Sequence, residues 1–197
     1  MSVSLWVLLG AGLAVFFWGV GAYNRLVRLK NAIANAFGQI DVQLKRRYDL
    51  IPNLVEVARK YLAHEAQTLE AVIAARNQAR TAEQTAAASP LNAGALGALA
   101  GAEQLLGGAL GRLFAVAEAY PDLKADQNMR ELSEELSSTE NRIGFARQAY
   151  NDNVLEFNDA AAQFPALIVA RLFNFAPQAM LESTTSEAER QTLRIEI

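Results

Sequence analysis

An uninterrupted apolar run near the amino end constrains this chain more than any other feature. Leu5 to Ala22 contains no charged side chain, and the uncharged residues Tyr23 and Asn24 follow it. A helix made from this run is about 27 Å long at ~1.5 Å per residue, close to the ~30 Å thickness of a hydrocarbon layer. The run therefore predicts a helix that spans a membrane.

Aromatic side chains lie at both ends of this segment. Trp6 is near its start, and Trp18 and Tyr23 are near its end, where amphipathic rings favour the membrane–water interfaces. The alternative is a cleaved secretory signal, because Val20-Gly21-Ala22 resembles a cleavage site. A secretory signal carries Lys or Arg before its apolar run, and this chain has neither there. We therefore expect residues 1–24 to be an anchor.

Positive charge follows the span immediately, at Arg25, Arg28 and Lys30, and none precedes it. The flank of a span that is rich in Lys and Arg stays in the cytoplasm. We therefore expect the amino terminus outside and residues 25–197 in the cytoplasm. These membrane-proximal cations also suit anionic lipid headgroups, so membrane lipids are an expected partner.

Charge is also divided within the remaining chain. Residues 25–60 carry an excess of Lys and Arg, and residues 103–140 carry an excess of Asp and Glu. Two interpretations stay open: the basic block faces lipid headgroups, or the two blocks pair with each other across the fold.

The composition argues against most enzymes. The chain has no cysteine and a single histidine, His64, which excludes disulfides, thiolate nucleophiles and Cys-ligated metal sites. His64-Glu65 is not a zinc motif, because Thr68 occupies the position of the second histidine. We predict a protein that is not an enzyme and that binds no cofactor, metal or nucleic acid.

Apolar residues recur every three or four positions through most of residues 26–161, which predicts four amphipathic helices. Only residues 193–197 show the alternation of a strand. Helices of this length joined by short turns pack as antiparallel neighbours. The predicted fold is all-α: an N-terminal transmembrane helix, an antiparallel four-helix bundle and a short apolar C-terminal helix.

Two segments interrupt the helical pattern. Asp49 is a plausible N-cap with Pro52 in the first turn, which predicts that one helix ends there and another begins; a continuous, kinked helix is the alternative. The Ala- and Gly-rich stretch Thr81–Gly111 should break at Ser89-Pro90. We expect a flexible connector after that break, and close backbone packing through the glycines is the alternative.

The most distinctive polar residues fall in two regions, Ile40–Val55 and Asn141–Asn158. Together with Tyr23–Val27 and Leu113–Ala125, these strings resemble the LemA family of bacterial membrane proteins over residues 23 to about 175. The candidate site residues carried by this resemblance are Asp41, Arg46, Arg47, Asp49, Pro52, Asn53, His64, Glu65, Arg76, Asn141, Arg142, Arg147, Tyr150, Asn151 and Asn158. The region 85–102 and the tail after Phe175 depart from the family pattern.

The resemblance implies an anchored cytoplasmic bundle in the bacterial inner membrane and no catalytic residue set. From the residues themselves, we expect Asp41 and Asp49 to pair with arginines of the last long helix, Arg142 and Arg147. We expect the Asn151 and Asn158 amides, seven residues apart, to bond to an adjacent backbone. A partner or ligand site at the bundle end is the alternative role for these groups.

The predicted domains are the anchor 1–24, the bundle 25–175 and a polar tail 176–197. The apolar segment from Phe164 to Phe175 either caps the core or lies on the bilayer or on a neighbouring protein. We expect a homo-oligomer, because small residues in the span and this apolar segment offer contact surfaces. The candidate contact residues are Gly10, Ala14, Pro165, Leu167, Ile168, Leu172 and Phe173.

These features predict a scaffold or assembly module in bacterial envelope maintenance or stress, with other envelope membrane proteins as further candidate partners. The alternative is a receptor-like module that senses a small ligand or lipid in a bundle-end cleft. An apolar cavity near Arg46, Arg47 and Arg147 would favour the receptor, and a tightly packed core with a flat apolar outer face would favour the scaffold.

Overall fold

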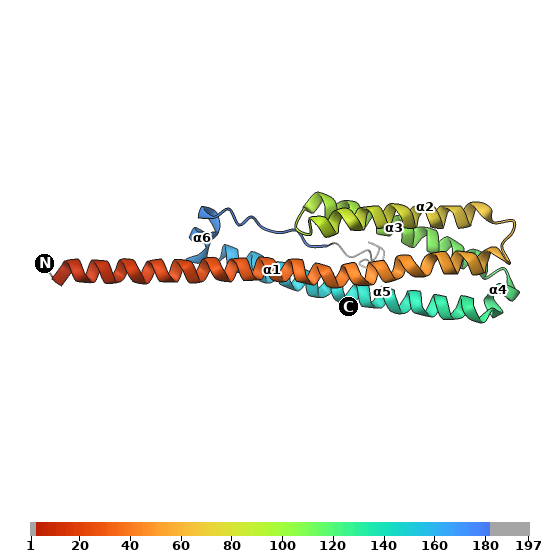
Figure 1. Ribbon diagram of the computed structural model, residues 1–197, viewed down its shortest axis with the longest axis horizontal. Coiled ribbons are helices and arrows are strands. Elements are labelled where there is room, and N and C mark those ends of the chain that lie inside the picture. The colour runs from red at the N-terminus through yellow and green to blue at the C-terminus, as the bar shows by residue number, and fades with distance from the viewer. Residues whose placement is uncertain (1–2, 182–197) are drawn as a thin grey trace, which may run out of the picture.

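The computed structural model describes residues 3–181, and every regular element in that range is a helix. Four long helices lie side by side, and the short α6 lies against α1 at the end of the bundle opposite α4 (Figure 1). The all-α prediction is confirmed, whereas the tail 182–197 lies outside the described residues. The helices are α1 (Val3–Arg59), α2 (Ala66–Ala88), α3 (Ala93–Ala117), α4 (Pro121–Ala125), α5 (Gln127–Ala162) and α6 (Ala166–Leu172).

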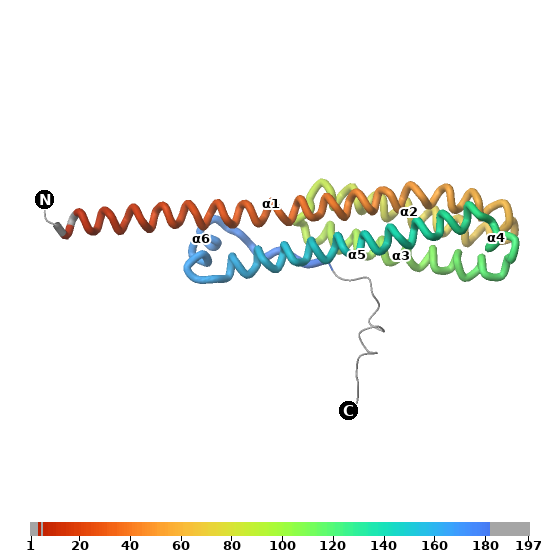
Figure 2. The backbone as a smooth tube through the Cα atoms, turned by 90° about the horizontal axis from the view of Figure 1, so that it is seen from below, coloured from red at the N-terminus to blue at the C-terminus, as the bar shows by residue number. Residues whose placement is uncertain are grey.

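The predicted span and the first bundle helix form one helix, α1. Its large apolar side chains are exposed from Trp6 to Phe17, and burial begins with Leu26. Figure 2 shows this N-terminal part projecting beyond the other helices. Within the described residues, α1 is the one helix that is long and apolar enough to cross a membrane.

The predicted helix end at Asp49 is wrong, because α1 continues through Pro52 to Arg59. Proline lacks the N–H that would bond to the carbonyl four residues earlier, which belongs to Tyr48. Arg76 of α2 donates its Nε to that carbonyl at 3.0 Å. A neighbouring helix therefore satisfies the acceptor that Pro52 leaves open, and the alternative of a continuous helix is the correct one.

The predicted flexible connector is also wrong. The chain does break at Ser89-Pro90, but α3 begins at Ala93, where the Asn92 side chain caps it by accepting from the Ala95 N–H at 3.0 Å. Nor do the glycines of α3 pack closely on other backbones. A Cβ atom placed on any of them beyond the first turn would meet no atom within 4 Å; they are Gly97, Gly101, Gly107, Gly108 and Gly111. These glycines leave empty space on the helix surface.

The apolar positions predicted from Leu26 to Tyr48 form the centre of the core, and all of them are buried. α1 packs extensively against α5 and α2, and α2 packs against α3. α3 and α5 form no comparable seam. The bundle is therefore closed on three sides and open between α3 and α5.

The chain reverses after α6 and returns along the bundle. Asn174 has a positive φ of 56°, and the Phe175 N–H bonds to the Ala170 carbonyl at 2.9 Å. This is the usual way to end a helix with a left-handed residue, a role that Asn tolerates. The following segment, residues 173–181, is called the C-terminal strap below. Its residues 176–181 belong to the polar tail that was predicted from the sequence.

Candidate functional site

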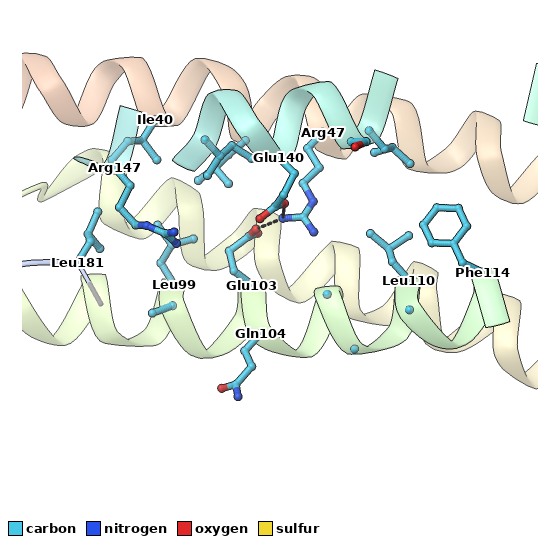
Figure 3. Close-up of a pocket in the computed structure, with 18 of the residues that line it drawn as sticks. Ile40, Arg47, Leu99, Glu103, Gln104, Leu110, Phe114, Glu140, Arg147 and Leu181 are labelled. Atoms are coloured by element: carbon cyan, nitrogen blue, oxygen red, sulfur yellow. Dashed lines mark hydrogen bonds and ion pairs between the residues drawn. The ribbon is translucent and has the colours of Figure 1, made fainter. Parts of the chain in front are cut away.

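The open side of the bundle contains a groove of about 630 Å³. α3 and α5 form its walls, α1 forms its floor, and the strap reaches one end of it at Leu181 (Figure 3). Most of the surface is apolar. The lining residues include Ile40, Leu44 and Arg47 of α1, Leu99, Ala100, Glu103, Gly107, Gly108, Leu110, Gly111 and Phe114 of α3, and Ser133, Leu136, Ser137, Glu140, Ile143 and Arg147 of α5.

Small side chains on the facing walls produce the groove. Gly107 and Gly111 are four residues apart on α3, so they share one face of the helix, and Ser133 and Ser137 do the same on α5. None of these side chains is large enough to fill the space between two helices. Each glycine also lowers helix stability by ~1 kcal/mol relative to alanine. The sequence therefore keeps this space open at a cost to the stability of α3.

One arginine joins three helices across the groove. Arg47 Nη1 of α1 lies 2.8 Å from Glu103 Oε2 of α3 and 2.8 Å from Glu140 Oε2 of α5. Figure 3 shows both carboxylates directed at this guanidinium. The Tyr48 hydroxyl also donates to Glu103 Oε1 at 2.6 Å. The Arg47 and Glu103 side chains are each 10% exposed, but Glu140 is 49% exposed, so Glu140 is the member of the cluster that is most open to solvent.

Burial sets the protonation of this cluster. Burial raises the pKa of Glu103, while the Arg47 charge and the Tyr48 hydrogen bond oppose that rise. Burial, and then the negative charge of Glu103, raise the pKa of Tyr48 far above its usual range. Tyr48 therefore stays a neutral phenol, and its hydroxyl donates to the Glu103 carboxylate.

A second buried carboxylate lies between α1 and α2, outside the groove. Lys45 Nζ is 2.6 Å from Asp41 Oδ2 and 3.6 Å from Glu83 Oε1, and Glu83 is buried. Burial and then Asp41 raise the pKa of Glu83 to about 7. Burial also raises the pKa of Asp41, but hydrogen bonds with Glu83 and Lys45 outweigh it and lower that pKa overall. The pKa of Glu83 thus lies near neutral pH.

The strap is attached to α5 by two asparagines, as their spacing predicted. Asn158 Nδ2 donates to the Gln178 carbonyl at 2.9 Å and Asn158 Oδ1 accepts from the Gln178 N–H at 2.8 Å. Asn151 forms the same pair of bonds with Leu181, at 3.0 and 2.9 Å. The Tyr150 hydroxyl donates to the Pro90 carbonyl at 3.3 Å. These bonds place Leu181 at the end of the groove.

The structure distributes the remaining candidate residues over separate places. Arg46 pairs with Glu135 of α5, and Glu65 precedes α2 without a capping bond from its side chain. The predicted pairing of Asp41 with Arg142 or Arg147 is wrong, because Asp41 bonds to Lys45 on its own helix. Five candidates are exposed side chains apart from the groove: Asp49, Asn53, His64, Asn141 and Arg142. Between residues 3 and 181, no cluster of His, Asp and Glu is suited to hold a metal ion.

Glu103 and Glu140 were missed as individual residues in the sequence, although a signal for them existed. They belong to the acidic block 103–140, and Arg46 and Arg47 belong to the basic block 25–60. Both arginines pair with that acidic block. For these residues, the alternative that the two blocks pair across the fold is therefore correct.

Known proteins are similar to most of this chain. Protein LemA of Metamycoplasma hominis is 28% identical over 94% of this chain and 79% of its own length. Magnetosome protein MamQ of Magnetospirillum gryphiswaldense is 25% identical over 78% of this chain, and MamQ 2 of Paramagnetospirillum magneticum is 26% identical over the same share. This chain spans 62% of the length of both MamQ proteins.

A family model extends the similarity along most of the chain. The model for the LemA family matches residues 36–196, which include the groove, the strap and most of the tail that departed from the pattern in the sequence. The apolar N-terminal part of α1 precedes the matched range. The chain is a membrane-associated helical protein, and it belongs to the LemA family.

Proposed function

We propose that this protein is a non-enzymatic, single-pass scaffold of the bacterial cytoplasmic membrane, and that its groove binds an amphipathic helix of a partner protein. The observation that supports this proposal is the open side between α3 and α5. Because α3 and α5 do not pack extensively against each other, a further helix can pack between them.

The dimensions and chemistry of the groove suit a helix. Its α3 wall runs from Leu99 to Phe114, which is about 22 Å or four helical turns at ~1.5 Å per residue. The glycines and serines allow a guest backbone to approach closely, while Leu110 and Leu136 offer apolar contact. Helix-in-groove recognition uses this combination of apolar anchors and a long concave surface. The half-exposed Glu140 would select a cationic residue on the guest.

The anchor supports an assembly role. Arg25, Arg28 and Lys30 follow the apolar segment and favour a cytoplasmic bundle. Proteins confined to one membrane meet at high effective concentration, so modest contacts suffice for assembly. Gly10 and Ala14 on the exposed part of α1 are our candidates for contact between copies of the chain. Two relatives are named magnetosome proteins, and we propose envelope or organelle membranes as the setting.

A receptor for a small apolar ligand is the second candidate function. The groove volume of about 630 Å³ lies within the roughly 300–1,000 Å³ that is usual for ligand pockets. Arg47 and Arg147 both line it, which is the arrangement that would favour a receptor. The cavity lies along the side of the bundle, whereas the sequence suggested the bundle end.

Site-specific photocrosslinking of the full chain in native membranes tests both candidates. A photoreactive phenylalanine at Ser137 or Gly108 should form a protein adduct, and one at Phe145, exposed on α5 outside the groove, should not. Gly111→Leu should abolish the Ser137 adduct by filling the groove. Adducts only with small molecules or lipids would support the receptor instead. No adduct beyond the level at Phe145 would contradict both.

A further inference from the structure

A second exposed apolar surface lies where α5 turns into α6. Residues 164–173, which form it, are called the α5–α6 corner below. Phe164 is 81% exposed and Leu172 is 75% exposed, and Ile168 and Phe173 are exposed as well. α6 is nevertheless attached to the core, because its opposite face buries Val169 and Ala170. α6 therefore has two apolar faces. One face packs on the core, and the other is exposed.

The position of this corner beside the span indicates what covers it. A crevice of about 340 Å³ separates Trp18, Gly21 and Ala22 of α1 from Phe164 and Pro165. The Tyr23 ring contacts Phe173 at a centroid distance of 4.8 Å and Phe175 at 5.6 Å. The uncovered face therefore lies level with the last turns of the apolar run that enters the membrane.

We propose that the α5–α6 corner inserts into the headgroup–acyl boundary of the bilayer that α1 spans, as a second lipid-binding site. When Leu5–Ala22 fills the hydrocarbon layer, side chains level with Trp18–Ala22 lie at its edge. Exposed Phe and Leu side chains with the nearby cations Arg25 and Arg171 match that boundary. The proposal rests on α1 as the membrane anchor, and not on what binds in the groove.

Attachment at two points has a mechanical consequence. A single helix would let the bundle rotate and tilt about its membrane exit. With the α5–α6 corner held in the same leaflet, and α6 joined through the strap to Leu181 at the groove, the bundle and its groove keep one orientation relative to the membrane. The apolar residues of the α5–α6 corner, whose exposure to water is unfavourable, would thereby help to fix the orientation of the bundle on the membrane.

Spin labelling of the full chain in phosphatidylcholine–phosphatidylglycerol vesicles tests the proposal. The chain has no cysteine, so single variants label uniquely. Nitroxides at Phe164→Cys and Leu172→Cys should relax faster with oxygen than with a water-soluble nickel chelate, as labels buried roughly 5–10 Å below the interface do. Val15→Cys, exposed in the apolar run and not among our candidates for contact between copies, is the reference inside the bilayer. Phe145→Cys, an equally exposed phenylalanine on the bundle side, is the reference in water.

The possible outcomes separate the proposal from its alternatives. Labels at Phe164 and Leu172 that match Phe145, while Val15 reports the bilayer, would overturn lipid insertion and leave the anchor intact. Protection from both relaxing agents with spin–spin broadening would also overturn it, since a second copy of the chain would then cover the face. Circular dichroism of each variant establishes that the exposed substitutions leave the helices formed.

Discussion

Helix α5 packs on two neighbours in opposite ways. Towards α1 it buries Tyr150, Val154 and Phe157 in an extensive seam. Towards α3 it presents Ser133, Ser137 and Glu140 across a groove. The difference shows that the size of the facing side chains, and not the helical pattern, decides which side of this bundle closes.

The two sides are also stabilised by different forces. A fully buried large apolar side chain contributes about 1.5–3 kcal/mol, and the α1–α5 seam has many of them. Across the groove, the contact that joins α3 to α5 runs through Arg47 and two glutamates. Buried ion pairs add little to the net free energy of unfolding, but removing one partner is strongly destabilising because the other charge is left buried and unpaired. The seam holds the fold together, and the cluster sets the position of the groove walls.

The largest effect should come from cutting into the seam. Phe157→Ala removes a ring that is completely buried, which should lower the free energy of unfolding by roughly 3–5 kcal/mol. Phe145→Ala, on the same helix but exposed, should change it by less than about 0.5 kcal/mol. Denaturant unfolding of both full-length variants measures the difference. Equal losses would mean that the seam is not the stabilising side.

Breaking the charge cluster should have the next largest effect. Glu103→Ala leaves Arg47 buried with a single, half-exposed partner and deprives Tyr48 of its acceptor, so we expect a loss of roughly 3 kcal/mol. Glu140→Ala removes the exposed partner and should cost less than about 1 kcal/mol. Thermal melts rank the two variants. A larger loss for Glu140 would reverse the assignment of the buried and exposed members.

The buried Glu83 should make stability depend on pH. Its folded-state pKa of about 7 lies above the ordinary value of 4.5, so the folded protein binds this proton more tightly than the unfolded chain does. The contribution of Glu83 to the free energy of unfolding is therefore largest below about pH 4.5. It falls as the pH rises to about 7 and is constant above that. The loss is at most about 3.5 kcal/mol, because the pKa values of about 7 and 4.5 differ by about 2.5 and one pKa unit corresponds to about 1.4 kcal/mol.

Glu83→Gln is the variant that isolates this effect. Glutamine keeps the shape of the side chain and removes its titration, so the variant should lose less stability than the parent between pH 5 and 8. Asp41 and Lys45 remain in the variant. The pKa of Asp41 is lowered and that of Lys45 is raised, so neither group changes charge between pH 5 and 8. Unfolding curves at each pH provide the comparison, and parallel profiles for the two proteins would exclude Glu83 as the source.

The smallest effect should be a gain in stability on the groove side. Gly107→Ala and Gly111→Ala each add a methyl group where nothing lies within 4 Å, and each should stabilise α3 by up to about 1 kcal/mol. Their melting temperatures should rise together and additively. A fall would show that these glycines are needed for close packing rather than for space.

Helical periodicity predicted the fold because each stripe of apolar residues is a local property of its own helix. The stripe from Leu26 to Tyr48 identified the core for this reason. The polar amides of Asn151 and Asn158 were also predictable, since seven residues return to the same helical face. What they bond to, the strap at Gln178 and Leu181, depends on a chain reversal that no local pattern specifies.

The two wrong boundaries had a non-local cause. Pro52 continues a helix because Arg76, far along the chain, supplies the missing hydrogen bond. The Gly-rich α3 is helical because Leu96, Leu106 and other residues of its apolar stripe pack in the core and outweigh the glycines. Glu103 and Glu140 likewise meet only through Arg47. The site could not be predicted where its parts are assembled by tertiary packing.

Cysteine crosslinking across the groove is the most direct test of the central claim that α3 and α5 stand apart. The full chain in vesicles would carry Gly107→Cys with Ser137→Cys on the facing walls of the groove, and a long bis-maleimide that links the same two cysteines is the positive control for labelling. A disulfide needs Cα atoms within about 7 Å. We expect the long bis-maleimide to link the two cysteines and oxidation to leave them unlinked. Rapid disulfide formation between the groove cysteines would contradict the claim that α3 and α5 stand apart.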